Sequence, residues 1–210
     1  MDGVTLNTEP IYARAEISLF KEYGVTIPAE NWSLFRGCSE IDFYKLSMDK
    51  YNIKEDFNIF LQKGRKYVEY EFSKGIPFMP GFIALQKKIS PYFYMGLVTA
   101  SPRHSLNKTI KKLNLNFYFD YIVSGEDATN NKPHPDPYIL MMNKLNVLPK
   151  YVVIVEDSLV GLNAALASGA HVVAKTGSVP NEQLSHISYK INHLSEINKS
   201  LLKEILQKNI

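Results

Sequence analysis

The sequence predicts an α/β protein with a parallel sheet covered by helices on both faces, and a separate all-helical segment near the amino terminus. Two observations support this class. Residues 11–73 contain apolar positions at helical spacing only. After Pro80-Gly81, short apolar runs alternate with helical patterns, as in βαβ units. In such sheets the chemistry lies beyond the carboxyl ends of the strands.

Residues 11–73 are predicted to be helical throughout. Ile17, Phe20 and Tyr23 share one helical face, and Ser39-Glu40-Ile41-Asp42 fits a capping pattern that opens a second helix. A longer helix follows, whose apolar positions are Phe57, Phe60, Leu61, Val68 and Phe72. Pro77 and Pro80-Gly81 then interrupt the helical pattern, which favours a boundary there between the helical segment and the rest of the chain.

The second half alternates strands and helices. The expected strands are 92–99, 121–123, 151–155 and 171–174. The expected helices are 103–113, 137–145, 160–168 and 201–206. The third helix is rich in small residues and ends at Gly169, a typical C-terminal stop.

Composition narrows the classes of function. The 210 residues are 45% hydrophobic and 21% charged, enough for a packed core. The single cysteine, Cys38, has no partner for an internal disulfide, so we expect a cytoplasmic protein. No apolar run reaches the roughly 18 residues of a membrane span, and the net charge of +3 argues against a nucleic-acid partner.

Polar residues follow two of the expected strands. Thr99-Ala100-Ser101 offers a hydroxyl and backbone amides to an anion; the alternative is a helix cap at Thr99 or Ser101. Glu156-Asp157 places two carboxylates after an apolar strand, where they repel unless a cation lies between them. Oxygen ligands of this kind suit Mg²⁺; the alternative is that Asp157 only caps the next helix.

Two further segments complete the set. Lys132, held by Pro133, is a candidate to neutralise a phosphate oxygen, against the alternative of a solvated surface lysine. Asp2-Gly3 reads as a turn. The topology would bring all four segments to one crevice.

With these four motifs in this order, the sequence resembles the haloacid dehalogenase (HAD) superfamily over essentially its whole length. It is most similar to the branch that includes β-phosphoglucomutase-like and phosphoglycolate phosphatase-like members. The resemblance implies a Rossmann-like core over residues 1–10 and 80–210, with an inserted helical cap over 11–79. It also implies a Mg²⁺-dependent phosphatase that acts on a small phosphorylated metabolite through an aspartyl-phosphate.

The resemblance also assigns roles. Asp2 is the general acid and base, and its carbonyl is a ligand of Mg²⁺ together with Glu156 and Asp157. Thr99 and the Ala100 amide hold the phosphoryl group, and Lys132 neutralises it.

The first motif, at Met1-Asp2-Gly3-Val4, departs from the family pattern at its first position. The nucleophilic aspartate is expected one residue before Met1, on a strand at the centre of the sheet, and neither is present in residues 1–210. We therefore expect a truncated amino terminus, with the 210-residue chain inactive as it stands. Asn7 also replaces the usual aspartate, in a role that is mainly structural.

The cap sequence bears on the substrate. Arg36 lies in a loop that faces the active site in related caps, where it would meet an anion or a sugar, or else act as a helix-terminal cation. Sugar phosphomutases carry a histidine and an arginine where this chain has Tyr12 and Glu40, which favours hydrolysis over mutase activity. The other alternative is a non-catalytic protein that binds phosphorylated ligands or a protein partner. The oligomeric state is left open.

Overall fold

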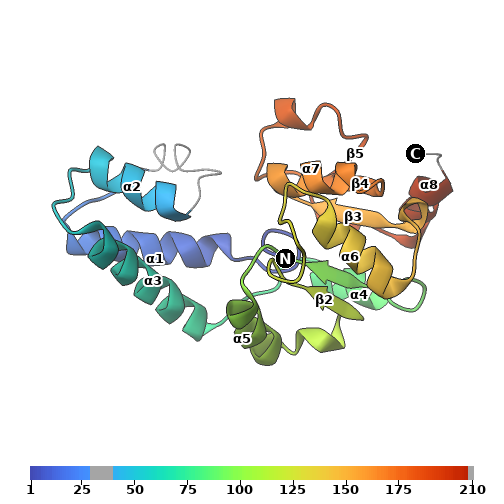
Figure 1. Cartoon of the computed structure of the whole chain (residues 1–210), viewed down its shortest axis with the longest axis horizontal. Coiled ribbons are helices and arrows are strands. Elements are labelled where there is room, and N and C mark those ends of the chain that lie inside the picture. Colours follow the sequence, from blue (N-terminus) through green and yellow to red (C-terminus); the bar gives the residue numbers. More distant parts are fainter. Residues whose placement is uncertain (29–39, 208–210) are drawn as a thin grey trace. The chain divides into compact units, whose positions relative to one another are not determined.

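A computed structural model describes residues 1–28 and 40–207 of the chain. Its contacts divide the chain into two compact units. Unit 1 consists of Met1–Leu6 and Phe78–Ile210, and unit 2 consists of Asn7–Pro77. Figure 1 follows the chain through both.

Unit 2 is helical in the part that the structure describes. It contains α1 (Glu9–Glu22), α2 (Glu40–Lys50) and α3 (Phe57–Lys74). Asp56 caps α3, because its carboxylate accepts hydrogen bonds from the amides of Asn58 and Ile59. Edge-to-face ring contacts build its core, which contains Leu19, Phe20, Phe43, Tyr44, Ile53, Phe60 and Leu61.

Unit 1 contains two parallel sheets. One pairs β1 (Gly96–Val98) with β2 (Tyr121–Val123), and Leu97 lies opposite Ile122. The other has the order β3 (Val153–Glu156), β4 (His171–Lys175) and β5 (Tyr189–Ile191). The α-helices of this unit are α4 (Phe82–Ile89), α5 (Arg103–Leu113), α6 (Asp136–Leu145), α7 (Leu159–Ala167) and α8 (Lys199–Gln207). Short 3-10 helices cover Leu115–Phe117, Pro149–Tyr151, Asn181–Leu184 and Leu194–Glu196.

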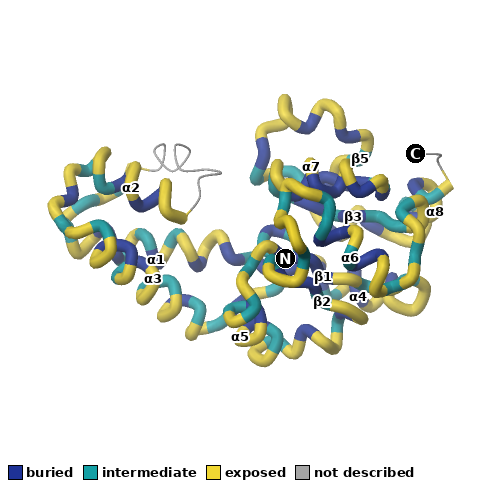
Figure 2. The backbone as a smooth tube through the Cα atoms, viewed as in Figure 1, coloured by how far each residue is buried: buried dark blue, intermediate teal, exposed yellow. Residues whose placement is uncertain are grey.

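The strand residues alternate between two hydrophobic clusters, as side chains of a pleated strand must. Val98 and Ile154 pack with residues of α6 and α7 on one face. Leu97 and Val173 pack with residues of α4 and α8 on the other. Each cluster draws on both sheets, so the two sheets share one layer between helices. Buried stretches accordingly run through the strands, whereas the loops are mostly exposed (Figure 2).

This architecture confirms the predicted α/β class with parallel strands and a helical insertion. Strand 121–123 and helix 103–113 have the predicted bounds. The strand expected over 92–99 is shorter, because the amides of Tyr92 and Phe93 bond to the carbonyl of Ile89 and continue the turn after α4. Helix α4 and strand β5 were not predicted. Among the described residues, no helix is both long and apolar enough to cross a membrane.

Candidate active site

Lys132 bridges the carboxyl ends of β1 and β3. Its ammonium lies 2.5 Å from Oε1 of Glu156 and 3.4 Å from the carbonyl oxygen of Val98. The side chain is only 6% exposed, and the ammonium also lies 4.8 Å from the centre of the Tyr138 ring. The lysine is therefore a buried cation at the end of the sheet, and the alternative of a solvated surface lysine is wrong.

Glu156, the last residue of β3, is buried and held by several donors. Its Oε1 accepts hydrogen bonds from Lys132 and from the Tyr138 hydroxyl, and its Oε2 accepts one from the Ser158 hydroxyl. Burial alone would raise the pKa of Glu156, but the charge of Lys132, the Met1 ammonium and the hydrogen bonds from Lys132 and Tyr138 lower it to about 2. Burial, together with the Glu156 carboxylate, raises the pKa of the Tyr138 phenol. Glu156 is thus an anion at neutral pH.

Gly161 keeps room for this carboxylate. A Cβ added at Gly161 would lie 2.3 Å from the Glu156 carboxyl group, which is too close for any side chain. Because Gly161 also bonds through its amide to the Ser158 hydroxyl, the start of α7 is fixed beneath Glu156. Ser158, rather than Asp157, caps this helix.

Asp157 follows Glu156 and is packed against the first turn of the chain. A Cβ added at Gly3 would lie 1.8 Å from Oδ2 of Asp157, so the Asp2-Gly3 turn lies directly on this carboxylate. Oδ2 accepts a hydrogen bond of 2.8 Å from the Ser178 hydroxyl. Burial and the neighbouring Glu156 raise the pKa of Asp157, against the opposing effects of Ser178, the Met1 ammonium and Lys175.

The turn that carries Asp2 is closed by backbone hydrogen bonds. The Met1 carbonyl accepts from the amides of Thr5 and Leu6 at 2.7 and 3.0 Å, and the Gly3 amide donates to the Leu6 carbonyl. Gly3 has φ +67°, a left-handed conformation that suits glycine. The turn that the sequence predicts at Asp2-Gly3 is confirmed.

Thr99 directly follows the Val98 carbonyl that Lys132 contacts. It is buried, its amide donates to the Val123 carbonyl, and its Oγ1 accepts a hydrogen bond from the Ser101 amide. The same hydroxyl lies 3.1 Å from the Ser101 hydroxyl. Ala100 lies between them, with its carbonyl packed against Gly125. The predicted hydroxyl is thus at the same edge of unit 1 as Lys132.

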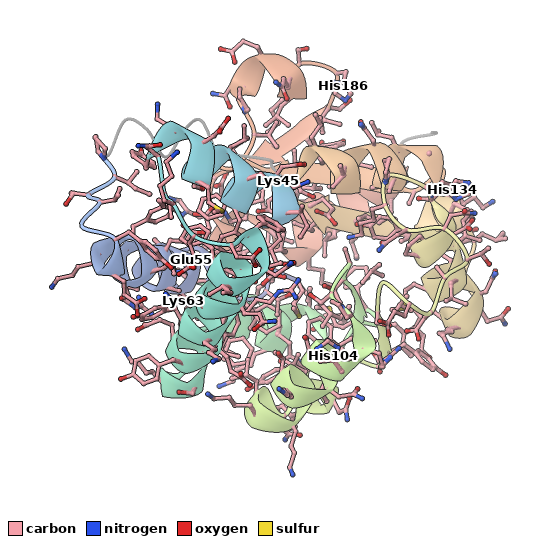
Figure 3. The ribbon with its side chains drawn as sticks, turned by 60° about the vertical axis from the view of Figure 1, so that its left-hand side comes forward. Lys45, Glu55, Lys63, His104, His134 and His186 are labelled. Atoms are coloured by element: carbon pink, nitrogen blue, oxygen red, sulfur yellow. The ribbon has the colours of Figure 1, made fainter. Side chains whose placement is uncertain are left out.

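The donors at this edge suit a hard cation. Glu156 and Asp157 supply only oxygen, the ligand type that Mg²⁺ prefers. Asp157 has the better oxygen to offer, since both oxygens of Glu156 already accept hydrogen bonds. Within residues 1–28 and 40–207, no three side chains of histidine, cysteine, aspartate and glutamate gather in a way that would hold a metal ion. Any Mg²⁺ here would need backbone oxygen or water to complete its ligands. Figure 3 shows His104, His134 and His186 on separate segments.

The cap residues singled out in the sequence have structural partners within unit 2. Tyr12 packs edge-to-face on the Phe72 ring, with centroids 5.5 Å apart. Glu40 forms a two-pronged ion pair with Arg65, at 2.7 and 3.1 Å. Arg36 lies outside the described residues.

Sequence reasoning missed the residues that orient the carboxylates. Tyr138 lies at an apolar position of α6, where its spacing indicates core packing, so no signal in the sequence links its hydroxyl to Glu156. Ser178 lies in a loop 21 residues after Asp157 and has no motif of its own. Of these three residues, only Ser158, next to the acid pair, could have been predicted, because serine is favoured at the N-cap of a helix.

The fold and the site define an α/β enzyme class in which the polar groups lie beyond the carboxyl ends of parallel strands and a helical unit is inserted near the amino terminus. Residues 1–175 match the haloacid dehalogenase-like hydrolase family, and the chain belongs to that family.

Named relatives support the assignment of the chain to this family. The chain is 31% identical over 170 residues to a phosphorylated carbohydrates phosphatase of Thermotoga maritima, covering 80% of this chain and 79% of the relative. It is 30% identical over 178 residues to hexitol phosphatase B of Escherichia coli, covering 80% and 77%. A Thermotoga maritima structure assigned provisionally as a beta-phosphoglucomutase has a TM-score of 0.80 at 28% identity, covering 97% of this chain and 96% of that one.

Proposed function

We propose that the protein is a Mg²⁺-dependent phosphoric monoester hydrolase that acts on a small phosphorylated metabolite through an aspartyl-phosphate. The observation that carries this proposal is the bridge made by Lys132, which joins the end of β1, next to Thr99, to the acid pair that ends β3. Phosphoryl transfer requires this combination, because negative charge must be held and neutralised around one phosphorus atom.

Each residue has a part in the chemistry. The hydroxyl of Thr99 and the amide of Ala100 would bind oxygens of the transferring phosphoryl group. Lys132, whose charge is already desolvated, would neutralise them. Asp2 would give a proton to the leaving alcohol and then take one from the attacking water. Tyr138 and Glu156 would hold the lysine in place.

Mg²⁺ would be held by Asp157, Glu156 and the carbonyl oxygen of Asp2. When bound, it would supply positive charge that stabilises the phosphoryl oxygens. Asp157 suits this role because burial and Glu156 raise its pKa, which a nearby cation would reverse. Ser178 would orient its carboxylate.

The nucleophile of this mechanism would be a carboxylate on the residue joined to the nitrogen of Met1. Its oxygen would attack phosphorus, the bond to the leaving alcohol would break, and water would then attack the acyl phosphate, releasing inorganic phosphate and the free carboxylate. We propose that residues 1–210 alone do not turn over.

The names of the relatives and the contacts of unit 2 support a substrate class. Two relatives are named as phosphatases of phosphorylated carbohydrates and hexitols, which favours a sugar or polyol phosphate. In unit 2, which would serve as the cap, Glu40 is paired with Arg65 and Tyr12 packs on Phe72. Neither residue supplies the histidine or arginine of a phosphomutase, so we favour hydrolysis.

The test is phosphate release by a chain extended before Met1 with an apolar segment that ends in aspartate. It would be assayed on hexose, hexitol and nucleoside monophosphates with Mg²⁺ present. We expect turnover that is lost in Asp157→Asn and after chelation of the metal, and that is absent when the added aspartate is asparagine. Binding of phosphate esters without release by any version would instead favour a non-catalytic binding protein.

A further inference from the structure

The loop that follows β2 lies directly on the loop that follows β1. We call residues Thr99–Ser101, after β1, the phosphate loop, and residues Ser124–Asp127, after β2, the clamp loop. The Gly125 amide donates a hydrogen bond of 3.2 Å to the carbonyl of Ser101, so the two loops are joined through their backbones. The pairing of β1 with β2 therefore continues past the last residues of both strands.

Gly125 permits this close approach because it has no side chain. A Cβ added there would lie 2.4 Å from the carbonyl oxygen of Ala100, which leaves no room for any other residue. That carbonyl belongs to the same peptide group as the Ser101 N–H, and this N–H donates to Oγ1 of Thr99 at 3.1 Å. Gly125 thus holds the peptide group that orients the hydroxyl of Thr99.

Two carboxylates of the clamp loop hold the other end of the phosphate loop. Arg103 opens α5 just beyond that loop, and the residue before it, Pro102, makes no side-chain cap. The Arg103 amide donates instead to Oε2 of Glu126 at 3.1 Å, and its guanidinium donates to Oδ2 of Asp127. The same Oδ2 accepts a hydrogen bond of 2.7 Å from the Ser124 amide. One carboxylate oxygen therefore ties the turn of the clamp loop to the start of α5.

The exposure of the ion pair indicates what it contributes. The side chains of Arg103 and Asp127 are 35% and 27% exposed, and pairs that water reaches add little to the stability of a fold. Their effect is on position. The phosphate loop is short and is held at both ends, by Gly125 and by Arg103, which limits how far its donors can move. Donors fixed in this way bind a ligand without a further loss of conformational freedom.

We propose that Gly125 and Asp127 are positioning residues, which keep the hydroxyl of Thr99 and the amide of Ala100 in place for one phosphoryl group. Neither residue contacts the phosphoryl group itself. Gly125 acts through the backbone of the phosphate loop, and Asp127 acts through Arg103. That the ligand is a phosphate rests on the proposed function, whereas the clamp loop rests on its own contacts.

The first experiment measures amide hydrogen exchange in the 210-residue chain without ligand. Asp127→Asn removes the charge that pairs with Arg103. The matched control is Asp120→Asn, because Asp120 lies just before β2 and its Oδ2 accepts a hydrogen bond of 2.7 Å from the Met95 amide, at the opposite end of β1. We expect the Ser101 amide to exchange about tenfold faster in Asp127→Asn and at an unchanged rate in the control. Unchanged exchange in Asp127→Asn would overturn the proposal.

The second experiment titrates inorganic phosphate in the presence of Mg²⁺ and follows the amide NMR signals of Thr99 and Ala100. We expect Asp127→Asn to bind phosphate about tenfold more weakly, and Asp120→Asn to differ by less than about twofold. If Asp127 only neutralised Arg103, Asp127→Asn would release a cation beside the phosphate loop, and phosphate would bind more tightly. Tighter binding would therefore contradict a positioning role.

Gly125→Ala reaches the phosphate loop with no change of charge, and it replaces Asp127→Asn if that variant does not fold. It should show both effects, faster exchange at Ser101 and weaker phosphate binding. Faster exchange in the variants, with no phosphate bound by the unsubstituted chain, would refute the proposed function and leave the clamp loop intact. Phosphate binding by the unsubstituted chain, with neither effect in the variants, would refute the clamp loop and leave the proposed function.

Discussion

Replacing Lys132 with alanine removes the cation that pairs with the buried carboxylate of Glu156. Both side chains are almost fully enclosed, at 6% and 8% exposed. Removing one partner of a buried pair leaves an uncompensated charge, which typically costs about 3–5 kcal/mol. The pKa of Glu156 is about 2, against 4.5 for an ordinary glutamate, because Lys132, the Met1 ammonium and Tyr138 together outweigh the effect of burial. This net shift corresponds to about 3 kcal/mol, of which the contacts with Lys132 are one part.

The sign of the pH dependence follows from the lowered pKa. A carboxyl group with a depressed pKa in the folded state stabilises the fold above its unfolded pKa of 4.5 and loses that contribution as the pH falls toward 2. We therefore expect Lys132→Ala to lower the free energy of unfolding by about 3 kcal/mol at pH 7, but by only about 1 kcal/mol at pH 3.

Urea denaturation followed by circular dichroism measures both values. Lys144→Ala is the matched control, since Lys144 is an exposed lysine of α6 and should change stability by less than about 1 kcal/mol. Lys132→Ala combined with Glu156→Gln should recover part of the loss, because the unpaired charge is gone. A loss below about 1 kcal/mol at pH 7, or one that does not shrink in acid, would refute the buried pair.

Three further substitutions test other contacts. Gly3→Ala and Gly24→Ala both place alanine at φ +67°, but only the alanine at position 3 would meet Asp157. Thermal melting should show Gly3→Ala to be the more destabilising by more than about 1 kcal/mol. Equal losses of stability would contradict the contact between Gly3 and Asp157. Burial raises the pKa of Glu16 to about 7, so the fold loses stability as the pH rises from 4.5 to 7. Glu16→Gln should therefore stabilise the protein by up to about 3 kcal/mol at pH 8 and hardly at pH 4. An effect that does not change with pH would contradict the raised pKa of Glu16. Ser178→Ala should weaken Mg²⁺ binding about tenfold by calorimetry, and unchanged affinity would remove Ser178 from the site.

Local patterns predicted much of the fold. Strand 121–123 and helix 103–113 were found because each has a clear period and lies between turn residues. Helix α4 has Phe82, Leu85 and Ile89 at helical spacing, but it is only eight residues long and follows Pro80-Gly81, so the pattern is too short to predict it. Strand β5 has three residues and too short a pattern to detect.

The site could be predicted only in part. The positions of Thr99 and Asp157 follow from the rule that parallel strands end at one edge. Lys132 lies in the loop between β2 and α6, and its contact with Glu156 does not follow from that rule, because it spans 24 residues and depends on how α6 packs. The sequence allows Asp157 as the cap of the next helix, whereas in the structure Ser158 caps α7 and leaves Asp157 for another role.

In the proposed function, the ends of β1 and β3 and the first turn of the chain form one metal-dependent phosphate site. Adding Mn²⁺ in place of Mg²⁺ and recording amide NMR spectra tests this most directly, since the paramagnetic ion broadens only nearby signals. We predict broadening at Gly3, Thr99 and Asp157 together, lost in Asp157→Asn and competed by Mg²⁺. Broadening confined to other surfaces, or the same pattern in Asp157→Asn, would contradict a shared metal-dependent site at these residues.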